Sequence, residues 1–163
     1  MTWLIAFFVV AFVVAPVIWV MPTPAQRRQA RIRQHAHTLG LSINIVELPQ
    51  SRRAQVRKEG AQLGVRYCLP IKREKNVYRP QWLLWRVPPE GEDDVPPHCP
   101  KAVSAQADAL RARMAEDVVA LESGPEGYAV FWRERGEEEA VDRVAALLED
   151  VRQLAGGERL VRK

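Results

Sequence analysis

Side chains that could do chemistry are few in this sequence, and they lie far apart along the chain. His98 directly precedes Cys99, so an imidazole and a thiol are neighbours there. Residues adjacent in sequence seldom reach the geometry that a nucleophile and its base require. His35 and His37 are two residues apart, which on a helix separates them by about 200° around the axis. A metal site needs three or four ligands at suitable spacing, so the sequence predicts none.

Carboxylates occur in pairs and runs, but no apolar neighbours surround them that would raise a pKa. We therefore expect solvated charge on a linker and on polar helix faces. The sequence also lacks a G-x-S-x-G motif, a P-loop and a G-x-G-x-x-G loop. It predicts no catalytic residue and no cofactor, although an enzyme whose site forms only on folding stays an alternative. The carboxylate groups are Asp93–Asp94, Glu116–Asp117, Glu137–Glu139 and Glu149–Asp150.

A long apolar run lies near the start of the chain. Residues 3–21 read WLIAFFVVAFVVAPVIWVM and include no charged side chain. A helix of this length spans roughly 28 Å, close to the hydrocarbon thickness of a bilayer. Trp3 and Trp19 lie near its ends, where indole rings favour the headgroup boundary. Ala11 and Ala15 form a small-xxx-small step that allows two such helices to associate as a homo-oligomer. The run predicts an uncleaved transmembrane anchor.

Basic residues follow the apolar run, and no acidic residue occurs before Glu47. The positive-inside rule then places the N-terminus outside and the C-terminal domain in the cytoplasm, which in a bacterium means the inner membrane. Anionic lipid headgroups attract each nearby cation by about 1 kcal/mol. The residues predicted to set orientation and contact lipid, besides the two tryptophans, are Arg27, Arg28, Arg31 and Arg33.

Charge is divided unevenly along the chain. Residues 21–86 carry 14 Lys and Arg against 3 Asp and Glu, whereas residues 87–163 carry 10 against 17. Solvated charge close to lipid explains the basic part. The alternative is a membrane-tethered binder of nucleic acid or another anionic ligand that uses the basic segment 27–86. No aromatic-rich RNA-binding signature, zinc-finger spacing or helix-turn-helix accompanies this charge.

Hydrophobic periodicity downstream of the apolar run predicts an α+β domain of order β-β-β-α-β-α. A mainly antiparallel four-stranded sheet would be covered by two amphipathic helices, and the first three strands would form a meander. A two-residue alternation indicates the strands, and apolar stripes at helical spacing indicate the helices. The expected strands are 42–48, 64–71, 81–87 and 127–133, and the helices are 105–121 and the segment from Glu137 to Gly156.

These elements divide the chain into four parts. The predicted anchor at 1–21 is followed by a basic helical neck at 22–40, the α+β domain at 41–157 and a frayed tail at 158–163. The domain contains a Pro-rich acidic connector at 88–100, which cannot be a helix or an interior strand. Whether this connector splits the domain into two lobes stays open, since neither half alone has much core.

The function predicted from these features is that of a non-enzymatic accessory or scaffold subunit. It would be a single-pass inner-membrane protein whose cytoplasmic domain binds another protein. Trp82 and Trp85 lie on opposite faces of an expected strand, so one of them could contact the partner. Cys68 and Cys99 would be free thiols in a reducing compartment, with no assigned role.

Overall fold

The computed structural model describes residues 3, 23–72, 79–156 and 160. The chain divides into two units, residues 1–30 and residues 31–163, and each is considered by itself. In the first unit Trp3 is exposed, and the first residues of helix α2 (Pro24–Thr38) are present. The end of α2 from Arg31 onward belongs to the second unit, which also holds the sheet and the other helices after α2.

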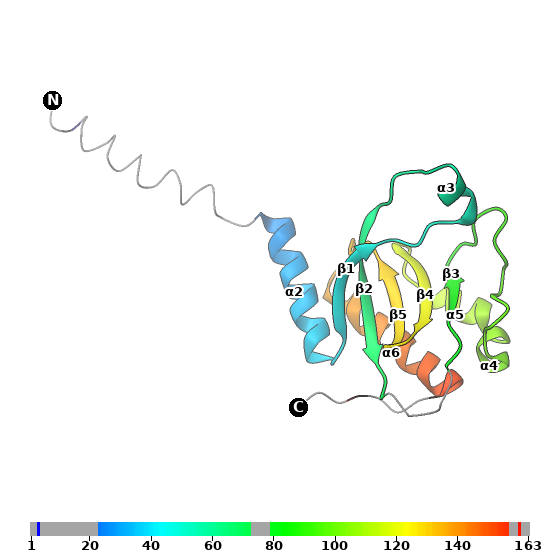
Figure 1. The fold of residues 1–163 in the computed structure, drawn as a ribbon. Coiled ribbons are helices and arrows are strands. Elements are labelled where there is room, and N and C mark those ends of the chain that lie inside the picture. The colour runs from blue at the N-terminus through cyan, green and yellow to red at the C-terminus, as the bar shows by residue number, and fades with distance from the viewer. Residues whose placement is uncertain (1–2, 4–22, 73–78, 157–159, 161–163) are drawn as a thin grey trace. The chain divides into compact units, whose positions relative to one another are not determined.

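A five-stranded sheet in the order β1-β2-β5-β4-β3 forms the centre of the second unit, and all its neighbouring strands are antiparallel (Figure 1). The edge strands are therefore β1 and β3, and β5 is central. The strands are β1 (Ser42–Glu47), β2 (Leu63–Pro70), β3 (Trp82–Trp85), β4 (Val118–Gly124) and β5 (Gly127–Trp132).

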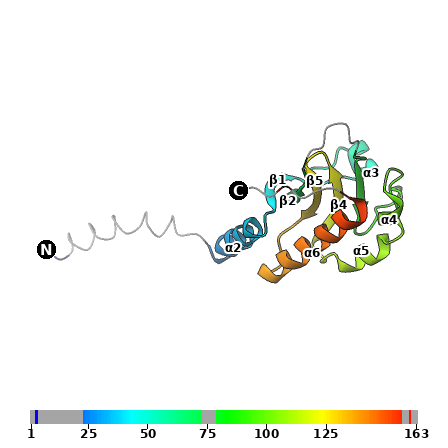
Figure 2. The ribbon, with the colours of Figure 1, turned by 90° about the horizontal axis from the view of Figure 1, so that it is seen from below.

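Helices cover one face of this sheet. The longest, α6 (Glu138–Ala155), crosses that face, with α4 (Lys101–Ser104) and α5 (Ala107–Arg113) beside it (Figure 2). A short helix, α3 (Arg52–Val56), lies in the connection between β1 and β2. Both views place the end of α2, the part that belongs to the second unit, next to β1 (Figures 1 and 2). The chain turns from α2 into β1 at Gly40, whose φ of 74° is the left-handed conformation that glycine adopts most easily.

Strand alternation sorts the apolar side chains into two clusters. The larger cluster lies between the sheet and the helices, and Tyr67 and Trp132 meet there edge to face, with ring centroids 5.2 Å apart. A smaller cluster lies on the other face of the sheet. Its buried members are Leu48, Trp85, Ala120 and Phe131.

The predicted four-stranded sheet is wrong, because β4 lies where the sequence predicts the end of a helix. Leu110 and Met114 continue to Val118 and Leu121 at helical spacing, yet the last two belong to a strand. A register irregularity between Val118 and Ala120 shifts the alternation by one residue. Val118 and Leu121 therefore both face the larger cluster, three residues apart, and imitate a helix.

The predicted meander is also wrong. β1 and β2 do pair, but the other neighbour of β2 is β5, and β3 pairs with β4 at the far edge. The hairpin formed by β4 and β5 thus lies between β2 and β3. This arrangement buries β5, whose six residues are all buried, at the centre of the sheet.

The structure corrects the predictions that depended on a membrane anchor. Among the residues that it describes, no helix is long and apolar enough to cross a bilayer. Apart from Trp3, the predicted span at residues 3–21 lies outside the residues that the structure describes, and so do Trp19, Ala11 and Ala15. A single-pass inner-membrane protein with a cytoplasmic accessory domain is therefore not supported, nor is a membrane-tethered nucleic-acid binder. The homo-oligomer through Ala11 and Ala15 and the contacts with anionic lipid depended on the same span and are not supported either.

Candidate functional site

The outer edge of β1 presents unpaired backbone. Residues of an antiparallel strand alternately direct their N–H and C=O groups toward and away from the neighbouring strand. The Leu48 N–H donates to the Gln62 carbonyl at 2.8 Å, in the same register that pairs Ser42 with Cys68. The even-numbered residues of β1 therefore bond to β2. The backbone groups of Ile43, Ile45 and Glu47 point away from the sheet.

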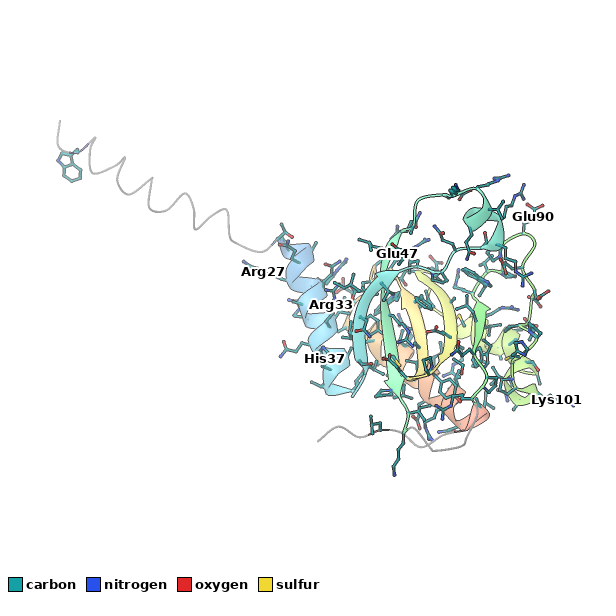
Figure 3. All side chains as sticks on the ribbon, viewed as in Figure 1. Arg27, Arg33, His37, Glu47, Glu90 and Lys101 are labelled. Atoms are coloured by element: carbon teal, nitrogen blue, oxygen red, sulfur yellow. The ribbon has the colours of Figure 1, made fainter. Side chains whose placement is uncertain are left out.

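Nothing among the described residues bonds to these outward groups. The end of α2 lies next to β1 (Figures 1 and 2), but the strand itself carries few of the features that protect an edge. It has no proline, no lysine and no bulge, and its only charge is Glu47 at its end (Figure 3). The side chain of Ile45 is 65% exposed although it lies in a strand. Residues 42–47 are thus a free, partly apolar template for pairing, which we call the β1 edge.

A hollow of about 900 Å³ adjoins the beginning of the β1 edge. Its walls include the end of α2 and the first residues of β1, together with Pro70 and Ile71 at the end of β2. The apolar side chains of Leu39, Leu41 and Ile43 contribute to its lining. Side chains of a strand added to β1 would therefore find space beside its first residues.

Below this edge, a buried carboxylate fixes α2 to the domain. Glu134 is only 3% exposed and is the second residue after β5. Its Oε1 accepts hydrogen bonds from Arg33 Nε at 2.9 Å and from the Tyr67 hydroxyl at 2.5 Å, while its Oε2 accepts one from Arg33 Nη2 at 2.6 Å. The carboxylate thus satisfies a guanidinium from α2 and a phenol from β2 together.

Burial of these groups changes their proton affinity. Burial of the Tyr67 hydroxyl, and then its hydrogen bond to the Glu134 carboxylate, raise the pKa of Tyr67 well above its usual range. The hydrogen bond to Glu134 raises the pKa of Arg33. Arg33 and Tyr67 therefore keep their protons at neutral pH, and the cluster is a structural clamp.

The arginines predicted to contact lipid have different surroundings. Arg31 pairs with Glu138 at 3.1 Å, and Arg33 pairs with Glu134. Arg27 and Arg28 belong to the first unit, where Arg27 is exposed and Arg28 half-buried. At least two of the four basic side chains therefore hold α2 against carboxylates of this domain.

Trp82 and Trp85 lie on opposite faces of β3, as the alternation of a strand requires. Trp82 is 5% exposed in the larger cluster, and Trp85 is 8% exposed in the smaller one. Their role as partner contacts stays a prediction. Trp85 is the better placed of the two, because it lines a groove at the end of the sheet.

Cysteines and histidines are the other reactive side chains among the described residues. Cys68 is buried in β2 and Cys99 is half-buried, and both are free thiols whose pKa is raised by burial. His35 bonds through Nε2 to Asp142 Oδ1 at 2.8 Å, which ties α2 to α6. Within the described parts of the chain, no three His, Cys, Asp or Glu residues are grouped as metal ligands would be.

Sequence reasoning missed the β1 edge: it assigned residues 42–48 to a strand, but the proline at position 70 pointed to residues 64–71 as the edge strand instead. The available signal was the run of apolar side chains in Ser42–Glu47 with no flanking lysine or internal proline. This signal becomes informative only once the strand order is known. No known protein family, no curated protein and no solved structure matches this chain.

Proposed function

We propose that the domain is a peptide-binding module that adds an extended segment of a partner protein to its sheet as a sixth strand along β1. The observation that carries this proposal is the outward backbone of Ile43, Ile45 and Glu47, which is free of bonds to other described residues. Main-chain hydrogen bonds to such an edge supply affinity, and pockets for alternate side chains supply specificity.

The surroundings of β1 define the chemistry of the segment. Its residues on the helix side of the sheet would lie beside Ile43 and Ile45, so apolar side chains fit there. Its residues on the other side would lie beside Ser42, Asn44 and Val46, so small or polar side chains fit. We therefore expect a segment that alternates apolar with small or polar residues. This proposal depends on neither the predicted span nor the predicted tryptophan contacts.

Amide hydrogen exchange measured by NMR tests the mode of binding. A peptide selected from a displayed library of alternating ten-residue sequences should slow exchange at Ile43, Ile45 and Glu47. The amides of Asn44 and Val46 already donate to β2 and should change little. Uniform protection along β1, or protection confined to the helices, would contradict strand addition.

A pair of variants tests whether the peptide binds at the β1 edge. Ile45→Lys puts a charge on the β1 edge and should weaken peptide binding at least about tenfold, since lysine on an edge strand opposes pairing. Val56→Lys is the matched control, because Val56 is a strongly exposed apolar residue on α3, outside the β1 edge. Equal affinity for the two variants would locate the peptide elsewhere.

A further inference from the structure

A second concave feature lies at the end of the sheet where β1 ends and β2 begins. It is a groove of about 400 Å³, within the range of small-molecule sites. Its floor consists of Leu48, Trp85 and Val119, which belong to the smaller apolar cluster. The hollow beside the β1 edge shares no lining residue with this groove.

The walls of the groove are tied to one another. The connection 49–62, which contains α3, arches toward the segment after β3, and Glu90 lies beside it (Figure 3). Arg52 N–H donates to Glu92 Oε1 at 2.6 Å, and Arg53 Nη1 donates to Glu90 Oε2. Because these bonds connect the walls to each other, binding would require little additional ordering of the chain.

Two opposite charges line this groove without a partner in the described residues. Arg86 is half-buried and Glu116 is exposed, and their side chains do not pair with each other. Arg133, also in the lining, donates to Gln62 Oε1 at 3.3 Å. Glu59, the fourth charged residue of the lining, pairs with Arg57 at 3.9 Å. Beside its apolar floor the groove therefore offers the Glu116 carboxylate and the half-buried Arg86 guanidinium, while the exposed Arg133 bonds to a neutral amide.

We infer that the groove binds a free α-amino acid with a large apolar side chain. The α-carboxylate would pair with the Arg86 guanidinium, a geometry that permits two parallel hydrogen bonds. The α-ammonium would pair with Glu116, and the side chain would cover Leu48, Trp85 and Val119. A ligand with both charges satisfies both side chains, whereas a simple anion or cation satisfies one. This inference is independent of the peptide module, because it uses no residue of the β1 edge.

Titration of the full chain with L-phenylalanine, followed by NMR, tests the inference. We expect saturable shifts at Leu48, Trp85 and Val119 with L-phenylalanine at concentrations up to about 10 mM. Phenethylamine lacks the carboxylate and 3-phenylpropionate lacks the ammonium, so each should bind about tenfold more weakly or worse. Absence of a saturable shift, or equal binding of all three compounds, would overturn the inference.

Two substitutions test which charged group of the ligand pairs with Arg86 and which pairs with Glu116. Arg86→Met should lower L-phenylalanine affinity about tenfold and leave phenethylamine binding unchanged, since that ligand has no carboxylate to lose. Glu116→Gln should also lower L-phenylalanine affinity about tenfold. It should leave 3-phenylpropionate binding unchanged, since that ligand has no ammonium group to lose. Arg135→Met and Glu139→Gln are matched controls, because both residues are exposed and lie outside the groove. An Arg86→Met variant that binds L-phenylalanine as the unaltered chain does would also overturn the inference.

Discussion

The two edges of the sheet are finished in different ways. At the β3 edge the outward carbonyl of Trp85 accepts a hydrogen bond from Arg111 Nε at 3.0 Å, and the same guanidinium bonds to the Asp94 carbonyl. At the β1 edge the described residues provide no such bond to Ile43, Ile45 or Glu47. The β3 edge also has only four residues, against six in β1. A side chain of the fold thus satisfies an outward backbone group at the β3 edge, whereas the outward groups of β1 have no bond from the described residues.

The bonds that stabilise the β1 side and the β3 side of the sheet also act on different elements. Arg111 acts on the edge strand itself, whereas the clamp at Glu134 holds α2 and β2 and leaves the β1 backbone free. An open edge can therefore coexist with a stably packed neighbourhood. The variants below separate the stability of each side from the availability of its edge.

Glu134→Ala should have the largest effect. It removes the acceptor of both Arg33 and Tyr67 and leaves these groups without their partner. We expect the free energy of unfolding to fall by about 3 kcal/mol, the lower part of the range for breaking a buried pair, since Arg33 is one-third exposed. Urea unfolding of this variant beside Asp93→Ala, an exposed carboxylate, measures the difference. Equal stability of the two variants would contradict a stabilising role for the bonds that Glu134 accepts.

Arg111→Met should cost about 2 kcal/mol, because the Trp85 carbonyl loses its charged donor. Thermal unfolding measures this loss, with Arg143→Met as the control for an exposed arginine that has no such bond. The β3 edge of the variant should then resemble the β1 edge. If the unfolding temperature is unaltered, the carbonyl of Trp85 does not depend on Arg111, and this bond does not distinguish the β3 edge from the β1 edge.

Alkaline pH should weaken the β1 side through Tyr67. Its pKa is raised in the folded state, so the stability it contributes is present below the unfolded value of about 10 and is lost as pH rises beyond it. The expected slope is about 1.4 kcal/mol per pH unit in that range. Urea unfolding between neutral pH and high pH should show a shallower decline in Tyr67→Phe. Burial also raises the pKa of Cys68 and Tyr128, so a residual decline remains. An unchanged slope would contradict the assignment to Tyr67.

Equivalent substitutions at the two edges give the smallest effects. Ile45 and Leu83 are both outward residues of edge strands, but Leu83 packs against the smaller apolar cluster and Ile45 is largely exposed. Leu83→Thr should therefore lower the free energy of unfolding by about 1 kcal/mol. Ile45→Thr should change it by less than about 0.5 kcal/mol. Denaturant midpoints of the pair report this difference, and the reverse order would mean that β1 is the more buried edge.

Local patterns in the sequence located most of the strands. The predictions at 42–48, 64–71, 81–87 and 127–133 overlap β1, β2, β3 and β5, since alternation is a property of neighbouring residues. The last helix, and the end of α2 just before Gly40, also follow from local signals. Local periodicity failed at β4, where the irregularity after Val118 gives a strand the spacing of a helix.

The candidate site could not be predicted in the same way. Which edge is open depends on the strand order, and this order follows from pairing between β2 and β5, which are far apart in sequence. The clamp joins Arg33 to Glu134 across 101 residues, so no short window contains both partners. Likewise, Arg86 and Glu116 become neighbours of one groove only when β3 and β4 pair.

The bond between Arg33 and Glu134 also determines how the domain would respond to force. A pull on the N-terminal side of the chain would enter this domain along α2, which precedes the edge strand β1 in sequence. If α2 detached, such a load would peel β1 from the sheet one hydrogen bond at a time. While α2 stays bound, part of the load passes from Arg33 to Glu134, the second residue after the central strand β5, and part from His35 to Asp142 of α6. Tension then acts on the interior of the sheet, and the β1 edge stays unloaded and available for pairing.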